Sequence, residues 1–119
     1  MEWLKITTNS EIVRISTDEI VYIKGDGNYS DIYLSNDKKE NVTCQLHELM
    51  DKLAKISNTP FCRVGKSLIV NKNFIFKVNP GLKKLLLSSS KMEKDILIQA
   101  SKDALKELKD TLEKEGGNS

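Results

Sequence analysis

Short apolar runs separated by turn-forming residues are the feature that most restricts the fold of this chain. The run Ile-Val-Tyr-Ile at 20–23 is an example: it is rich in β-branched and aromatic residues, and four residues are too few for a helix. Gly25-Asp26-Gly27-Asn28 follows it, and its glycines permit the positive φ of tight turns. The same pattern predicts strands at 3–7, 12–15, 20–23, 29–34, 41–43, 61–64, 67–70, 74–78, 82–87 and 96–98.

Two segments have helical periodicity instead. Leu46, Leu49 and Leu53 repeat on one face with Met50, which predicts an amphipathic helix over about residues 45–56. Thr43 is placed to cap it. Ser57-Asn58-Thr59-Pro60 is expected to end it, because the residue before a proline is disfavoured in helical geometry.

The second predicted helix is at the C-terminal end. Ser101 can cap it, and Gly116-Gly117 is expected to end it. Its apolar stripe consists of Ala104, Leu105, Leu108 and Leu112. The fold class is therefore mostly β, with short antiparallel strands, a central helix and a C-terminal helix.

The size and composition fit a single folded domain. The chain has 119 residues, of which 39% are hydrophobic and 30% are charged. We expect one domain over 1–115 and a flexible tail at 116–119. The start of the chain does not resemble a signal peptide, and no apolar run approaches membrane-spanning length, so we expect a cytoplasmic protein.

The sequence contains no convincing catalytic or metal-binding pattern. Cys44 and Cys62 lack the spacing of a zinc site, and His47 is the only histidine. His47 falls on the polar face of the predicted central helix, where a surface role is more common than general-base catalysis. We therefore expect no enzyme activity, no cofactor, no metal and no small-molecule substrate.

The charges are distributed unevenly along the chain. Between Lys52 and Met92 there are nine lysines and arginines and no acidic residue, and Phe61 to Lys72 lie at the centre of this stretch. A surface built from it would attract phosphate. Two other outcomes stay open: the cations pair with Glu48 and Asp51, or they remain hydrated.

The centre of that stretch resembles a known motif. Phe61-Cys62-Arg63-Val64-Gly65-Lys66-Ser67-Leu68-Ile69-Val70-Asn71 is similar to the signature of the LytTR-type DNA-binding domain of bacterial response regulators, the LytR/AlgR family. Further similarity is carried, in order and spacing, by Val21-Tyr22-Ile23, Gly27-Asn28-Tyr29, Thr43, Leu46, Ile75 and Ala100-Ser101-Lys102.

The resemblance implies an elongated β scaffold that binds double-stranded DNA through loops rather than through a recognition helix. Carried over by position, the DNA-binding candidates are Asn28, Tyr29 and Ser30 in one loop, Lys66, and Lys102. Arg63 and Lys72 flank Lys66 and are candidates for phosphate contact. The resemblance further implies sequence-specific transcriptional regulation at direct-repeat sites, with at most a weak homodimer on DNA.

The chain departs from the family pattern at three positions. Gly65 replaces the usual histidine, and Lys66 and Lys102 stand where arginine is frequent. Lysine keeps the charge but loses the bidentate fork that reads guanine. The alternative is therefore a protein-interaction module of the same fold that has lost specific DNA binding.

A further difference concerns the N-terminus. Many relatives carry a receiver domain before the DNA-binding fold, whereas here the first predicted strand begins close to Met1. We expect a stand-alone form without a receiver, or a piece cut from a longer protein.

Overall fold

A computed structural model of the chain describes residues 2–56 and 59–115. The first half contains a hairpin, a three-stranded meander and a helix: β1 (Trp3–Thr7), β2 (Ile12–Ser16), β3 (Ile20–Asp26), β4 (Tyr29–Leu34), β5 (Lys39–Val42) and α1 (Leu46–Ala54). The second half contains five strands and a helix: β6 (Phe61–Val64), β7 (Leu68–Asn71), β8 (Ile75–Asn79), β9 (Lys84–Leu87), β10 (Ile96–Gln99) and α2 (Lys102–Glu115). Short 3-10 turns at Thr17–Glu19 (η1) and Lys72–Phe74 (η2) precede β3 and β8.

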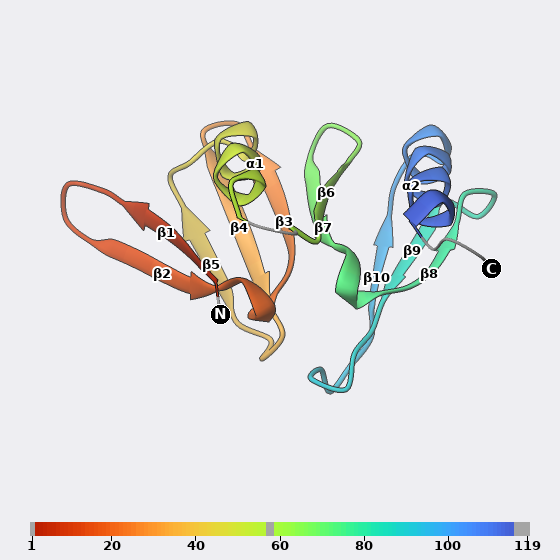
Figure 1. The fold of residues 1–119 in the computed structure, drawn as a ribbon, viewed down its shortest axis with the longest axis horizontal. Helices are drawn as coiled ribbons and strands as arrows, with labels where there is room; N and C mark the ends of the chain where they lie inside the picture. Colours follow the sequence, from red (N-terminus) through yellow and green to blue (C-terminus); the bar gives the residue numbers. More distant parts are fainter. Residues whose placement is uncertain (1, 57–58, 116–119) are drawn as a thin grey trace.

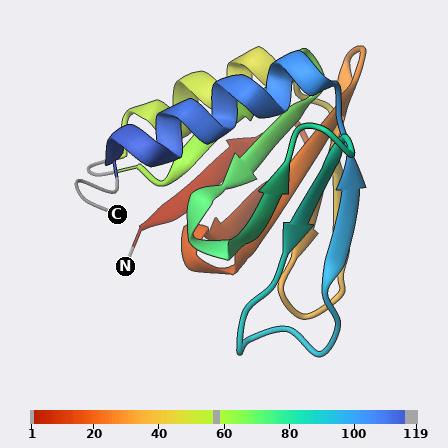
Figure 2. The same cartoon turned by 90° about the vertical axis from the view of Figure 1, so that its right-hand side faces the viewer.

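The strands form three antiparallel sheets. The central sheet has the order β5-β4-β3-β7-β6, the sheet at the C-terminal end has the order β10-β9-β8, and β1 and β2 form a two-stranded ribbon. The molecule is elongated, 46 × 29 × 28 Å, with the ribbon and the C-terminal sheet at opposite ends of its long axis (Figure 1). Both helices lie in the upper part of the molecule in Figure 2, and they pack against opposite faces of the central sheet. Neither is long and apolar enough to cross a membrane.

The central sheet separates two apolar cores. One face, with Ile23 and Ile69, packs against α1 and the β1-β2 ribbon. The other face, with Val21 and Val70, packs against α2 and the C-terminal sheet. In β7, Ile69 and Val70 are successive residues and therefore point to opposite faces. In β3, Val21 and Ile23 are two residues apart, and the irregularity in register between Ile20 and Tyr22 places them in different cores. β7 and the first half of β3 are covered on both faces, which explains the apolar runs at 68–70 and 20–23.

The predicted elements are confirmed, with small shifts at their ends. The mostly β class, the central helix and the C-terminal helix are all present. The prediction that Thr43 caps the central helix is wrong. Gln45 is the N-cap residue, and its backbone N–H donates to the Glu48 carboxylate at 3.2 Å. The expected break at 57–60 lies partly outside the described residues, and the expected tail at 116–119 lies entirely outside them.

Gly25 belongs to strand β3 rather than to the turn predicted there. A side chain at this position would place its Cβ 2.9 Å from Leu46 Cβ, because α1 packs directly against the strand. Only Gly27 has the positive φ that the turn needs, at 61°. Glycine at position 25 therefore allows close approach of the helix.

Asn71 connects the two halves of the structure at the end of β7. Its side chain is 1% exposed, its amide donates to the Ile20 carbonyl at 2.9 Å, and its Oδ1 accepts from the Asn73 backbone N–H at 2.9 Å. These bonds hold the start of β3 against η2. Asn71 is thus a buried scaffold residue.

Replacing Asn71 by alanine should lower the free energy of unfolding by about 1–3 kcal/mol, because the Ile20 carbonyl and the Asn73 N–H are left without their partner. Urea denaturation would measure the change. Asn73→Ala is the matched control, since the Asn73 side chain is exposed and only its backbone takes part in the bond. Equal stability of the two variants would contradict the role assigned to Asn71.

Candidate nucleic-acid interface

The turn between β6 and β7 presents Lys66 to solvent. Gly65 adopts a φ of 66°, a left-handed conformation that reverses the chain tightly. The Arg63 guanidinium donates to the Lys66 carbonyl at 2.8 Å and so braces the turn from the side. Lys66 itself is exposed. Arg63 therefore stabilises the backbone that carries Lys66, and it too is exposed.

The β3–β4 turn presents Asn28 and Tyr29, whose side chains are exposed. Asn28 Oδ1 accepts a 2.9 Å hydrogen bond from the Gln45 side chain, which ties this turn to the start of α1. Ser30 does not share the surface. It is 1% exposed, and its hydroxyl donates to the Cys44 carbonyl at 2.7 Å. Its role is to anchor β4 beneath the loop.

An open groove of about 380 Å³ joins these two turns to the N-terminus of α1. It is lined by Gly25, Asp26, Gly27, Gln45, Leu46, His47, Arg63, Lys66 and Ser67. Two cations and one carboxylate are among these residues, so the formal charge of the groove is positive. A positive concave surface with exposed backbone is suited to a phosphate chain.

The N-terminus of α2 lies next to the β6–β7 turn. A Cβ added to Gly65 would lie 3.6 Å from the Cβ of Ala104, in the first turn of the helix. Ser101 caps α2, as predicted, by accepting the Ala104 N–H at 3.1 Å. Lys102 is exposed beside this cap. The free N–H groups of a helix N-terminus and a lysine side chain both attract anions.

The β8–β9 turn extends the same surface. The Lys83 carbonyl accepts the Ala100 N–H at 3.2 Å, and Lys83 has a positive φ of 57°. Its side chain is exposed. A further cation, Lys83, thus lies beside the segment that leads into Lys102 at the start of α2.

These turns lie along one edge of the molecule. The β3–β4 turn, the β6–β7 turn and the start of α2 follow one another along the upper edge in Figure 1. In Figure 2, which looks along the long axis, the first and last of them lie toward the same upper right side. A model of the LytTr DNA-binding domain family matches residues 10–113. The chain belongs to this family.

A solved structure supports the same fold. The LytTr DNA-binding domain of a protein described as a methyl-accepting/DNA response regulator from Bacillus cereus superimposes with a TM-score of 0.66, at 17% sequence identity. The match covers 94% of this chain and 97% of that one. A search of curated protein sequences found no significant match.

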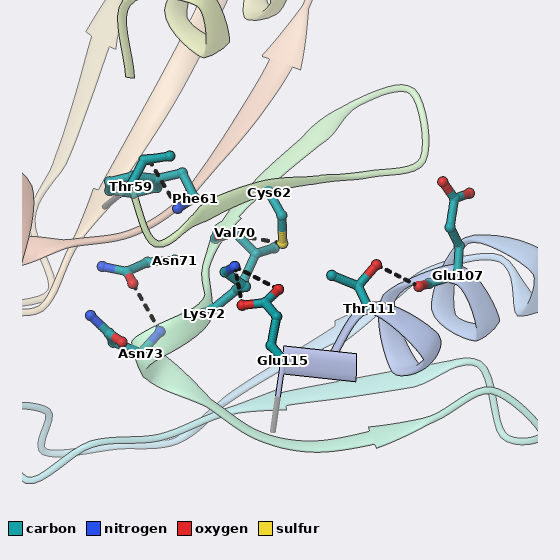
Figure 3. A network of polar contacts seen from close by, with 10 residues as sticks. All are labelled: Thr59, Phe61, Cys62, Val70, Asn71, Lys72, Asn73, Glu107, Thr111 and Glu115. Atoms are coloured by element: carbon teal, nitrogen blue, oxygen red, sulfur yellow. Dashed lines mark hydrogen bonds and ion pairs between the residues drawn. The ribbon is translucent and has the colours of Figure 1, made fainter. Parts of the chain in front are cut away.

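Lys72 is separated from the other candidates of this LytTR domain. It follows β7, whereas Lys66 precedes it, so the length of the strand lies between them. The Lys72 ammonium is 2.6 and 2.8 Å from the two carboxylate oxygens of Glu115 (Figure 3). Its side chain is only 19% exposed. The structure thus gives Lys72 an ion-pair partner at the end of α2.

The two cysteines of the LytTR domain lie in surroundings that disfavour the thiolate. Burial raises the pKa of Cys62 to about 11, and burial also raises the pKa of Cys44. The reactive form of a cysteine is the thiolate, which both shifts disfavour. Within residues 2–56 and 59–115, no three His, Cys, Asp or Glu side chains are grouped so as to hold a metal ion.

Three residues of the candidate interface could not be singled out from the sequence: Gln45, His47 and Lys83. Gln45, the N-cap of α1, and His47, in its first turn, line the groove because α1 starts next to the β3–β4 turn. The polar face of α1 was visible in the sequence, but its orientation toward the loop was not. Lys83 follows the Asn79-Pro80-Gly81 turn, a signal that could have suggested exposure.

Replacing Gly65 by alanine should lower the free energy of unfolding by about 1–2 kcal/mol, because a side chain with a Cβ is strained at this φ. Gly65→Asn should cost less, since asparagine tolerates left-handed geometry better. Thermal and urea unfolding would measure both. Gly81→Ala is the matched control, because Gly81 has no positive φ and its added Cβ makes only a 3.5 Å contact with Asn79 Oδ1. Equal free energies of unfolding for Gly65→Ala and Gly81→Ala would contradict the strain that a Cβ is expected to cause at position 65.

Proposed function

We propose that this LytTR domain is a sequence-specific reader of double-stranded DNA that regulates transcription and catalyses no reaction. Its three contact regions are the β3–β4 turn with Asn28 and Tyr29, the β6–β7 turn with Lys66, and the start of α2 with Lys102. Family membership supports DNA as the partner. The arrangement of the three exposed regions along one edge is the observation that carries the proposal (Figure 1).

The dimensions of the domain suit contact with more than one groove. One turn of B-DNA is about 34–36 Å long, and the long axis of the domain measures 46 Å. An edge of this length, placed along the duplex, reaches from one groove into the next. The turns therefore take the place that a recognition helix has in other DNA-binding domains.

The side chains divide into two kinds of contact. Lys66, Lys83 and Lys102 are exposed point charges, which fits phosphate binding better than guanine reading. Asn28 and Gln45 are joined by a hydrogen bond, and carboxamides are the groups that pair with adenine in the major groove. We assign docking to the lysines and much of the base discrimination to the carboxamides. Arg63 supports the β6–β7 turn, and it contacts phosphate from the groove.

The proposal extends to the mode of assembly on DNA. Copies that bind one face of the duplex side by side require direct-repeat sites, because a translation rather than a two-fold axis relates them. Contacts between such copies are weak, so a homodimer forms only on DNA. We place this regulator in a bacterial cytoplasm, in two-component signalling.

Replacing Lys66 or Lys102 by glutamate should abolish specific DNA binding, because each change introduces repulsion with phosphate. Gln variants at the same positions should weaken binding and reduce the slope of log K against log salt by about 0.9 each. Fluorescence anisotropy over a range of salt concentrations would measure both effects. The midpoint of thermal unfolding should stay nearly unchanged, since both side chains are exposed.

Lys94→Glu is the matched control for these reversals. Lys94 is exposed in the β9–β10 loop, at the lower edge in Figure 1, and the substitution changes the charge by the same amount. It should reduce affinity far less than the two reversals at the upper edge. Tight binding by both Lys66→Glu and Lys102→Glu would overturn the assignment of the interface.

Selection of bound sequences from randomised duplexes should enrich one motif, repeated in direct orientation. Replacing Asn28 by alanine should relax the preference at one or two base pairs of that motif, with about 1–3 kcal/mol lost in discrimination at each. Sequencing of the selected pools would measure this. Equal recovery of all sequences would show a nonspecific basic protein, and no recovery would show a module without DNA binding.

A further inference from the structure

The outer face of the C-terminal sheet is hollowed and largely apolar. This face looks toward the viewer in Figure 2, while the inner face buries Leu85 and Leu87 completely. The hollow has a volume of about 290 Å³ and is lined by Lys77, Asn79, Leu82, Lys84, Leu86 and Leu97.

The strand register explains how these side chains come together. Lys77, Leu86 and Leu97 are paired across the three strands and form one row. The next row toward the β8–β9 turn consists of Asn79, Lys84 and Gln99. Leu82 closes the hollow from that turn. Apolar groups thus occupy the middle of the face, and ammonium groups stand at its side and end.

The leucines are poorly covered. Leu82 is 64% exposed and Leu97 is 56% exposed. Within residues 2–56 and 59–115, no helix or strand packs over this face, because α2 lies on the inner side of the sheet. Apolar side chains grouped on a sheet surface and rimmed by polar ones are typical of interaction sites.

The charges around the hollow indicate what kind of partner fits. Lys77 and Lys84 line it, and no acidic residue does. Neither lysine forms an ion pair in the part of the chain that the structure describes. A second copy docked face to face would bring together two surfaces that each carry two lysines and no carboxylate, which is unfavourable. DNA offers phosphate to the lysines but nothing that would cover three leucines.

We infer that this face docks an acidic amphipathic segment of another protein. Its apolar side chains would cover Leu82, Leu86 and Leu97, and its carboxylates would pair with Lys77 and Lys84. The inference does not depend on the proposed DNA contacts. Because Leu82 is followed by Lys83 at the candidate DNA edge, the docked partner would stand beside the duplex.

The test is a selection from a displayed library of random peptides against the full chain, followed by fluorescence anisotropy with the selected peptides. Selected peptides should combine carboxylates with apolar side chains. The Leu97→Ser substitution should lower the affinity for these peptides by at least about tenfold. A Lys77→Glu/Lys84→Glu variant should no longer bind these peptides. A repeated selection against this variant should enrich basic peptides instead.

Ile12→Ser is the matched control, because Ile12 is a 60% exposed strand residue at the other end of the molecule. It should leave peptide binding unchanged. DNA affinity of Leu97→Ser, measured in parallel, should equal that of the unmodified chain, so that failure of one proposal is distinguished from failure of the other. The inference is overturned if no peptide is enriched, if neutral or basic peptides win, if Leu97→Ser binds as well as the unmodified chain, or if sedimentation shows a dimer that Leu97→Ser dissociates.

Discussion

The pairing of β3 with β7 is the interaction on which the rest of the structure depends. It consists of three ladder pairs, Tyr22 with Val70, Ile23 with Ile69 and Lys24 with Leu68. The Gly25 N–H extends it by donating to the Ser67 carbonyl at 2.8 Å. This ladder joins the meander of the first half to the β6-β7 hairpin of the second half and completes the five-stranded sheet.

The same pairing brings the parts of the candidate interface together. Because the two strands are antiparallel, the end of β3 meets the start of β7, so the β3–β4 turn and the β6–β7 turn emerge at the same edge. Gly25 then lets α1 approach closely enough for Gln45 to bond Asn28. Residues far apart in the sequence thus line one groove through backbone geometry. The strand pairing fixes the positions of the turns, and the lysines on these turns make the edge positively charged.

Much of the fold could be predicted from the sequence, because apolar runs and turn residues report on local structure. Even the burial of Ser30 could have been predicted from the sequence. Ser30 is separated by one residue from the buried Ile32, so the two side chains share one face of β4. Other features were not accessible. The pairing of Lys72 with Glu115 joins residues 43 positions apart, and the approach of Leu46 to Gly25 depends on how α1 packs. The stretch without acidic residues showed that cations are concentrated in this part of the chain, but not which surface each one occupies. The fold places Lys66 and Lys83 in turns at one edge, and the strand register places Lys77 and Lys84 on the outer face of the C-terminal sheet.

The presence of two cores on opposite faces of one sheet has a consequence for folding. Val21 and Ile23 lie on the same short strand, yet they belong to different cores, and Val70 and Ile69 repeat this division on β7. Neither core is complete until β3 and β7, which are separated by more than a third of the chain, have paired. Contacts so distant in sequence form slowly, because the intervening loop must close first. The two cores are therefore expected to appear in one late step and to melt together.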